Sequence, residues 1–202
     1  MSSLPELPFP LTAHGPAAEW NYSAGTLSVT AAPGQDRFVR PGAPPDPATA
    51  RDAPRLLGVP TGDFRLAAKV TVDLSAPGDA GGLYVHGTDD HWAKLCLERS
   101  PLRPTVVSVV TRTVSDDANA FETPDSSYWL RVSRTGGAFA FHASPDGQRW
   151  TFVRLFSLDT PKGAADVRVG FMPQSPSGTG CRVRYAHLSF RPGAPGGLRD
   201  GS

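Results

Sequence analysis

Apolar and polar residues alternate with a period of two along much of this chain, which is the pattern of strands that bury one face. No window contains a sustained apolar stripe at the 3.6-residue spacing of an amphipathic helix, so the pattern predicts no helix. About ten to twelve strands of this kind are enough for a two-sheet sandwich. The clearest predicted strands are Thr26–Thr30, Phe64–Val72, Gly82–His86, Ala93–Glu98, Thr105–Arg112, Tyr128–Arg134, Ala138–Ala143, Thr151–Leu158, Ala165–Pro173 and Cys181–Phe190.

Glycine and proline mark the boundaries between these segments. The chain has 21 Gly and 21 Pro in 202 residues, well above the average usage of roughly 7% and 5%. Two tetrapeptides, Arg134–Gly137 and Ser144–Gly147, are typical of tight hairpin turns. The longest irregular stretch runs from Gly34 to Pro60 and contains a short piece with packed character, Pro54–Leu57. We expect this stretch to cap one end of the sandwich or to line a cleft.

The length fits one domain. Residues 1–191 are predicted to form a single β-sandwich, and residues 192–202, rich in Gly and Pro without apolar spacing, a flexible C-terminal tail. The N-terminal residues lack a basic and apolar signal segment, and no stretch approaches the roughly 18 apolar residues of a membrane helix. We therefore expect a cytoplasmic protein with no membrane partner, in which Cys96 and Cys181 are free thiols.

The charges of the chain are nearly balanced. Lys and Arg number 20 against 19 Asp and Glu, a formal net charge of +1, so the chain lacks the basic excess of proteins that bind nucleic acids. Its arginines are spread over many predicted strands among acidic residues, which is typical of paired surface charges. The sequence therefore predicts no nucleic-acid partner, and function has to come from a local site.

Side chains two residues apart on a strand share a face, which divides each predicted strand into a core side and a second side. In Ala93–Glu98, for example, Leu95 and Leu97 are assigned to the core. If the predicted strands belong to one sheet, the second side gathers aromatic, cationic, acidic and amide groups. These residues are Tyr84, His86, Trp92, Lys94, Glu98, Trp129, Arg131, His142, Ser144 and Gln174.

This mixture of side chains suits a small polar ligand. Sugar rings stack on aromatic side chains, and Arg, Lys, Glu and Gln form hydrogen bonds with hydroxyl groups. We therefore expect the concave face of the sandwich to bind a carbohydrate or a related metabolite. The predicted ligand-binding residues are Tyr84, His86, Trp92, Lys94, Arg131, Trp129 and Gln174. The alternative is an ordinary solvated outer face, which in an antiparallel sheet also alternates polar and apolar residues.

An enzymatic function is the main rival hypothesis. Glu98 and His142 are the candidate catalytic residues for cofactor-independent acid–base chemistry of a lyase, isomerase, cyclase or glycosidase-like enzyme. A glycosidase needs two carboxyl groups across the scissile bond, and only Glu98 lies on the predicted face. Asp116 and Asp117 are assigned to the loop that follows. The sequence therefore leaves open whether the protein is an enzyme.

The sequence predicts no metal site and no cofactor. The five histidines are scattered without the spacing of zinc ligands, and no cofactor-binding motif is present. Asp116, Asp117 and Asn119 supply oxygen atoms close together, but a turn held by Asx hydrogen bonds explains them more simply than a calcium site. The string Ser144–Gly147 is likewise explained by a hairpin turn rather than by a hydrolytic triad with His142.

Several longer strings carry a family resemblance. They are Ala80–Tyr84, Trp92–Glu98, Ser108–Arg112, Ser115–Ala120, Trp129–Val132 and His142–Ser144, with Asp146, Gly147 and Trp150. In this order and spacing they resemble the regulation-of-enolase-protein family of concanavalin A-like domains, a family of unknown function. The resemblance extends from about Gly34 to Phe190. It implies a concanavalin A-like jelly roll, which is a sandwich of two antiparallel sheets with a concave face.

What the resemblance implies for function is less specific. The superfamily contains lectins, carbohydrate-binding modules and glycoside hydrolases, and a shared fold does not fix a shared activity. The closely spaced acidic triad of the laminarinase-like enzymes of this superfamily is missing from the sequence. The family's name indicates a regulatory role through a protein partner for some member, so a protein-interaction module is a third hypothesis.

Overall fold

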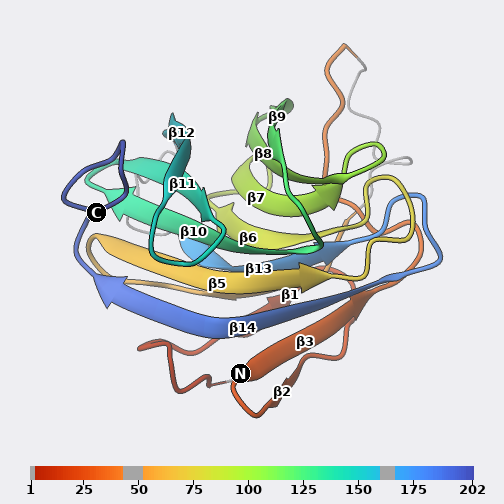
Figure 1. Ribbon diagram of the computed structural model, residues 1–202, viewed down its shortest axis with the longest axis horizontal. Coiled ribbons are helices and arrows are strands. Elements are labelled where there is room, and N and C mark those ends of the chain that lie inside the picture. Colours follow the sequence, from red (N-terminus) through yellow and green to blue (C-terminus); the bar gives the residue numbers. More distant parts are fainter. Residues whose placement is uncertain (1–2, 43–51, 160–166) are drawn as a thin grey trace.

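The chain folds into two antiparallel β-sheets that pack face to face (Figure 1). The computed structural model describes residues 3–42, 52–159 and 167–202. In these three ranges it contains fourteen strands, seven in each sheet, and no helix. The predicted all-β fold, a jelly-roll sandwich of two antiparallel sheets, is thereby confirmed.

The first sheet has the strand order β1-β4-β13-β6-β7-β8-β9. Its strands are β1 (Thr12–His14), β4 (Arg55–Gly58), β6 (Ala80–His86), β7 (His91–Arg99), β8 (Pro104–Arg112), β9 (Val114–Glu122) and β13 (Arg168–Gln174). Strands β6 to β9 pair in succession, whereas β13 comes from far along the chain and lies between β4 and β6. This crossover brings residues from three distant segments onto one surface.

The second sheet has the strand order β12-β11-β10-β5-β14-β3-β2. Its strands are β2 (Asn21–Ser23), β3 (Thr26–Ala31), β5 (Phe64–Val72), β10 (Ser127–Thr135), β11 (Ala138–Ser144), β12 (Thr151–Phe156) and β14 (Cys181–Pro192). The hairpin between β10 and β11 turns at Gly136, whose φ of 59° costs glycine little. The amide of Gly136 donates to Oδ1 of Asp63 at 2.9 Å, which ties this predicted turn to the start of β5.

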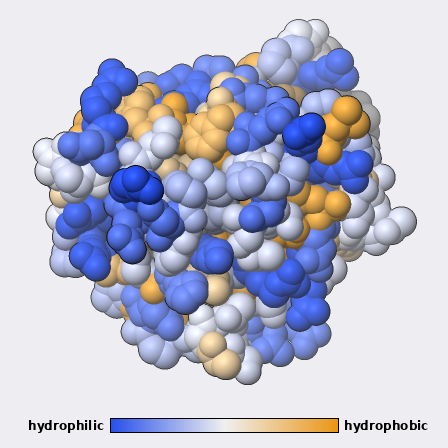
Figure 2. All heavy atoms as spheres, in the orientation of Figure 1, coloured by the Kyte–Doolittle hydropathy of each residue, from blue (hydrophilic) through white to orange (hydrophobic). Residues whose placement is uncertain are grey.

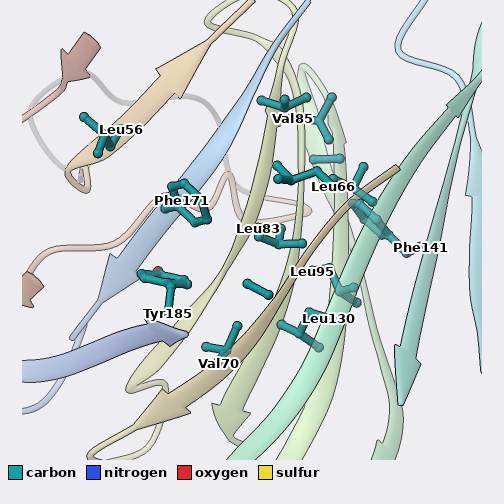
Figure 3. Close-up of a cluster of buried hydrophobic side chains, with 14 of the residues drawn as sticks. Leu56, Leu66, Val70, Leu83, Val85, Leu95, Leu130, Phe141, Phe171 and Tyr185 are labelled. Carbon is teal, nitrogen blue, oxygen red and sulfur yellow. The ribbon is translucent and has the colours of Figure 1, made fainter. Parts of the chain in front are cut away.

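The hydrophobic core lies between the two sheets. Figure 3 shows Leu83, Val85 and Leu95 of the first sheet pointing toward the second sheet. The second sheet meets them with the side chains of Leu66, Val70, Leu130, Phe141 and Tyr185. None of these eight residues is exposed, and burial of such apolar surface is the main driving force for the sandwich.

The predicted strands match the observed ones to within two residues at each end, with one exception. That exception is Ala165–Pro173, whose first two residues lie outside the described ranges and which is observed as Arg168–Gln174. The side-chain alternation inside the strands is also confirmed. In β6, Leu83 and Val85 face the core, whereas Tyr84 belongs to a second cluster on the outer face of the first sheet.

Strands β1, β2, β4 and β9 were not predicted, and β9 changes the placement of two carboxylates. Strand β9, with Asp116 and Asp117, was expected to be a loop, and that expectation is wrong. The strand forms the edge of the first sheet and most of its side chains are exposed. An exposed edge strand lacks the apolar alternation by which strands are recognised, so the sequence carried no signal for it.

A short segment crosses the outer face of the first sheet. We call Gln35–Val39 the strap; residues 43–51 of the same irregular stretch lie outside the described ranges. The amide of Ser175, beyond the end of β13, donates to the carbonyl of Gln35 at 2.8 Å. At the other end, Val39 and Ser115 exchange two hydrogen bonds of 2.9 Å. The strap therefore covers the middle of this face.

The residues after β14 lie against the second sheet, beside β10, β11 and β12 (Figure 1). Nη2 of Arg131 donates to the carbonyl of Gly201 at 2.7 Å, and Nε2 of His142 lies 2.7 Å from the carbonyl oxygen of Leu198. A Cβ atom on Gly201 would lie 2.7 Å from Cβ of Trp150, so the contact requires glycine. The mobility of residues 192–202 and the single domain over residues 1–191 stay predictions.

Both cysteines are buried. Cys96 and Cys181 are unpaired, as expected for free thiols. Burial raises the pKa of each thiol to about 12, so neither is a reactive thiolate at neutral pH. Across the described ranges, no helix has the length and apolar character that crossing a membrane requires. The cytoplasmic location stays a prediction.

A close contact between the two sheets yields a test of the core. A Cβ atom on Gly81 of β6 would overlap Cγ1 of Val183 in β14. We expect Gly81→Ala to lower the free energy of unfolding by about 1–3 kcal/mol, because extra volume in a packed core forces neighbours apart. Urea denaturation measures the change.

The matched control is the double variant Gly81→Ala with Val183→Ala, which removes the methyl groups that the new Cβ overlaps. The two changes should be non-additive, with the double variant more stable than the sum of the single effects predicts by about 1 kcal/mol or more. Additive effects would show that the sheets do not meet at this point.

Candidate functional site

Six of the predicted site residues lie on the outer face of the first sheet. They are Tyr84 and His86 of β6, Trp92, Lys94 and Glu98 of β7, and Gln174 of β13. Strand β6 lies between β13 and β7, and the register places His86 opposite Trp92 and Tyr84 opposite Lys94. The topology thus brings together residues that are up to ninety positions apart in the chain.

The other four predicted residues lie on the opposite side of the molecule. Trp129 and Arg131 of β10, and His142 and Ser144 of β11, project from the outer face of the second sheet. The expectation that all ten share one face is therefore wrong. Alternation shows which residues share one side of a strand, but long-range pairing decides to which sheet the strand belongs. Glu98 and His142 consequently do not form one acid–base pair.

Contacts on the second sheet explain these four side chains structurally. The guanidinium of Arg131 lies 4.3 Å from the ring centroid of Trp150, and burial together with the nearby Arg65 lowers the pKa of Arg131 to about 10. Oγ of Ser144 accepts hydrogen bonds from the amides of Asp146 and Gly147, at 3.2 and 2.8 Å. The turn interpretation of Ser144–Gly147 is thereby confirmed, and no hydrolytic triad is involved.

The aromatic rings of the first sheet are covered. Tyr84 and Trp92 stack with their centroids 5.6 Å apart and are 0% and 1% exposed. The guanidinium of Arg37 lies 5.4 Å from the centroid of Trp92, and that of Arg55 lies 5.7 Å from that of Tyr84. These cation–π contacts occupy the ring faces. A sugar can stack on Trp92 only after the strap has moved, and on Tyr84 only after the side chain of Arg55 in β4 has moved.

Lys94 is buried beneath the strap, and its ammonium group has three partners there. Its Nζ donates to Oε1 of Gln174 at 2.7 Å and to the carbonyl of Arg37 at 2.8 Å, and it lies 3.4 Å from Oδ1 of Asp36. An ammonium group has three donors, and a buried one is costly unless each finds a partner. Lys94 and Gln174 therefore hold the strap in place and have little capacity left for a ligand.

Glu98 is the most perturbed acid on this face. Burial raises the pKa of Glu98 to about 7; Lys94 opposes this effect and the carboxylates of Asp117 and Asp36 add to it. Nε2 of Gln174 lies 3.5 Å from Oε2 of Glu98. A carboxyl group that titrates near neutrality is suited to proton transfer. Within the described ranges, no group of three or more His, Cys, Asp or Glu residues is placed to hold a metal ion.

A cavity of about 450 Å³ opens at the end of the face opposite to Glu98. We call it the basic cavity. Strands β1, β4, β6 and β13 and the turn after β6 supply its walls. The lining residues are His14, Gly15, Arg55, Leu57, His86, Thr88, Asp89 and Arg168.

The arginines around this cavity differ in how they are paired. Arg55 forms an ion pair with Asp52 and donates to the carbonyl of Ala53 at 2.9 Å. Arg37, behind the cavity, lies 3.0 Å from the same carboxylate and 3.5 Å from that of Asp89. The side chain of Arg168 has no hydrogen bond or ion pair in the part of the chain that the structure describes. Its guanidinium is thus available at the cavity wall.

Both histidines of the basic cavity are neutral at physiological pH. Burial and the guanidinium groups of Arg168 and Arg55 lower the pKa of His14. Burial, followed by Arg37 and Arg55, lowers the pKa of His86 to about 4. Nδ1 of His86 is buried without a hydrogen-bond partner among the described residues. The cavity therefore presents two neutral imidazoles beside an excess of positive charge.

His86 was predicted from the sequence as a site residue, whereas the other residues that line the basic cavity were not. Arg168 and Gln174 are separated by an even number of residues on β13, so their side chains lie on the same face of the sheet. Assigning faces along the whole strand would therefore have identified Arg168. His14 lies on a three-residue strand and Arg55 on a four-residue one, and strands this short leave no periodic signal. Only the pairing of β1 and β4 with β13 brings these side chains to His86.

Comparison with known proteins places the chain in a family. The model of the family described as "Protein of unknown function (DUF1349)" matches residues 14–193. The chain belongs to this family. It is also 30% identical over 142 residues to Regulation of enolase protein 1 of Saccharomyces cerevisiae, a match that covers 69% of this chain and 70% of the yeast protein. The family resemblance expected from the sequence is thereby confirmed.

Two solved structures show the range of proteins that have a similar fold. A functionally unknown protein from Saccharomyces cerevisiae has a TM-score of 0.79 at 24% identity, covering 93% of this chain and 97% of the other. The GH43 protein BlXynB from Bacillus licheniformis has a TM-score of 0.65 at 14% identity, covering 85% of this chain but 34% of that protein. At such low identity these two structures show a shared fold, and a shared fold does not fix function.

The covered aromatic pair yields a prediction on stability. We expect Trp92→Ala to lower the free energy of unfolding by about 3–5 kcal/mol, because the substitution removes a buried ring and leaves a cavity beneath the strap. Urea denaturation measures the loss. Leu102→Ala, at a side chain that is 79% exposed, is the control and should change stability little. A Trp92→Ala protein as stable as the control would show that the ring is open to solvent.

Glu98 yields a prediction on pH dependence. Its pKa is about 7 in the folded protein against an ordinary value of 4.5, so the folded state holds the proton more tightly than the unfolded state does. The resulting stabilisation is complete below pH 4.5 and is lost as pH rises through 7. Glu98→Gln should therefore be more stable than the unchanged protein by about 1–3 kcal/mol at pH 8 and nearly equal to it at pH 4.5.

Thermal or urea unfolding of both proteins at the two pH values measures this difference. Glu122→Gln is the matched control, because Glu122 is exposed at the sheet edge, 3.7 Å from Arg103. The control should show no gain at pH 8. Equal pH dependence of the Glu98→Gln variant and the unchanged protein would contradict the burial of an ionisable carboxyl group here.

Proposed function

We propose that this protein is a binding domain for a small polar metabolite of the carbohydrate class or a related class, and that the basic cavity is its binding site. The observation that carries the proposal is the lining of this cavity: Nδ1 of His86 is buried without a hydrogen-bond partner among the described residues, and the partly exposed side chain of Arg168 is unpaired there. Buried polar groups in folded proteins are almost always paired. A bound ligand would pair with both side chains.

The size and composition of the basic cavity support this function. Small-molecule sites usually enclose about 300–1,000 Å³ and combine apolar walls with a few polar groups, and the cavity of about 450 Å³ falls in this range. Leu57 supplies an apolar wall, and Thr88 and Asp89 supply hydroxyl and carboxylate oxygens. The fold is shared with a GH43 protein, which favours a sugar-related ligand by analogy alone.

A ligand screen tests the proposal. Neutral mono- and disaccharides, sugar acids and sugar phosphates are added to the protein, and binding is measured by the shift in unfolding temperature and then by calorimetry. At least one compound should raise the unfolding temperature, because binding to the folded state alone stabilises it. The variant His14→Trp should weaken that binding tenfold or more, because a larger ring at the cavity wall fills the space while every arginine remains.

Leu102→Trp is the matched control, since it adds the same ring at an exposed position outside the cavity. Binding should be unchanged in this variant. The proposal fails if no compound binds, or if binding is equally strong in His14→Trp and in the unchanged protein.

A regulatory interaction with another protein is the second candidate. It is favoured by the name of the yeast relative, Regulation of enolase protein 1. The surface offers limited support: the face shown in Figure 2 is mostly hydrophilic, and the exposed large hydrophobic residues Val59, Leu102, Val114 and Leu155 come from separate elements. Titration with the enolase of the same organism should give a stoichiometric complex if this candidate is right, and no heat of binding if it is wrong.

A further inference from the structure

We propose that the ligand of the basic cavity carries an oxyanion, a carboxylate or phosphate group, and that the protein takes up a proton when this anion binds. The inference rests on the proposed function, because it names the class of ligand for the same cavity. Three features of the cavity carry it: the balance of charge, the pair of histidines and the shape of the adjoining surface.

Among the described residues, the charges around the cavity do not balance. Three guanidinium groups, those of Arg37, Arg55 and Arg168, face the two carboxylates of Asp52 and Asp89. Arg37 and Arg55 share Asp52, and Arg37 also reaches Asp89, which leaves Arg168 unpaired among the described residues. A guanidinium group pairs with carboxylates and phosphates through parallel hydrogen bonds, so the missing partner of Arg168 is an anion.

A neutral ligand fits this cavity poorly for the same reason. It would displace water from Arg168 without supplying an opposite charge, and removing a charge from water without a partner is costly. An oxyanion would replace the lost hydration by charge-assisted hydrogen bonds. The excess positive charge therefore favours anionic metabolites over neutral ones of the same size.

Protonation of a histidine in the cavity makes the affinity for the anion depend on pH. Burial lowers the pKa of His86 most, and the guanidinium groups of Arg37 in the strap, Arg55 in β4 and Arg168 in β13 lower it further. The carboxylate of Asp89, in the turn after β6, opposes them. An anion bound against Arg168 would cancel part of this repulsion, so the imidazole would be protonated more easily in the complex.

The sign of the pH effect follows from this change. A group whose pKa rises on binding takes up a proton, and the affinity then increases as pH falls. Without ligand, the pKa of His86 is about 4. An anion that raises this pKa toward its unperturbed value makes the affinity at pH 5.5 exceed that at pH 8, by at most about tenfold when the shift is complete.

The surface beside the cavity indicates what else the ligand carries. A second cavity of about 330 Å³ shares His14, Leu57 and Arg168 with the basic cavity. Its remaining walls include Phe9, Pro10 and Val59, which are apolar. Arg168 and His14 thus stand between a polar compartment and an apolar one. This arrangement suits a small acid with its oxyanion at Arg168 and a ring or carbon chain extending over Val59.

Sulfate is the probe that tests the anion site, because its charge stays constant between pH 5 and pH 8. Calorimetric titration at fixed ionic strength should show weak binding that strengthens by up to about tenfold from pH 8 to pH 5.5. Repeating the titration in buffers with different ionisation heats counts the protons taken up per sulfate. Arg168→Gln should weaken the binding tenfold or more at every pH, and His86→Gln should remove most of the pH dependence.

Arg149→Gln is the matched control, because Arg149 is an exposed arginine whose recorded ion pair is with Asp146, on the other sheet's side of the molecule. It should bind sulfate as the unchanged protein does. Arg168 is partly exposed and unpaired, so its variant should unfold at the same temperature, which separates a lost site from a lost fold.

The outcomes distinguish this inference from the proposed function. Sulfate binding that persists in Arg168→Gln, or that does not depend on pH, overturns the inference. A neutral sugar that binds in a manner sensitive to His14→Trp, while sulfate does not bind, overturns the inference and leaves the proposed function standing. If neither sulfate nor any compound of the screen binds, both fail. Loss of the pH dependence in His14→Gln rather than His86→Gln would overturn the assignment of the proton.

Discussion

The arrangement of the outer face of the first sheet depends on how one buried ammonium group is satisfied. Lys94 stands in the middle of β7 with 2% of its surface exposed, where an unpaired charge would be very costly. The strap supplies a backbone carbonyl and the carboxylate of Asp36, and Gln174 of β13 supplies an amide oxygen. The strap is thereby fixed across the sheet, and it carries Arg37 over Trp92.

This cover decides where a ligand can be bound. The strap buries the aromatic residues in the middle of the face, where they serve as packing. The two ends of the sheet differ in their chemistry. At one end Glu98 holds its proton near neutral pH, and at the other Arg168 and two neutral histidines line an accessible cavity. The unused hydrogen-bonding groups are concentrated at the second end, which is why the proposed function is placed there and not on the aromatic pair.

Much of the fold was predictable from the sequence, because burial between two sheets imposes an alternation that a single strand displays by itself. The segments Phe64–Val72 and Pro104–Arg112 show it, and their bounds were predicted to within one residue. Edge strands such as β9 were not predicted, because their side chains are mostly exposed to solvent and do not alternate between apolar and polar. The candidate site was predicted in part: His86 and Lys94 were placed on the correct side of their strands, whereas Arg131 and His142 proved to belong to the other sheet.

The sequence by itself determined the all-β class, the turns and the inward or outward direction of each side chain, since these are local properties of backbone and alternation. The tertiary structure alone decided which strands share a sheet, because pairing joins segments as distant as β4 and β13. It also decided that Trp92 is covered and that Arg168 is not, since charge pairing and burial depend on neighbours from other strands. The physical reason is the same in each case: a side chain's chemistry is set by its surroundings in space.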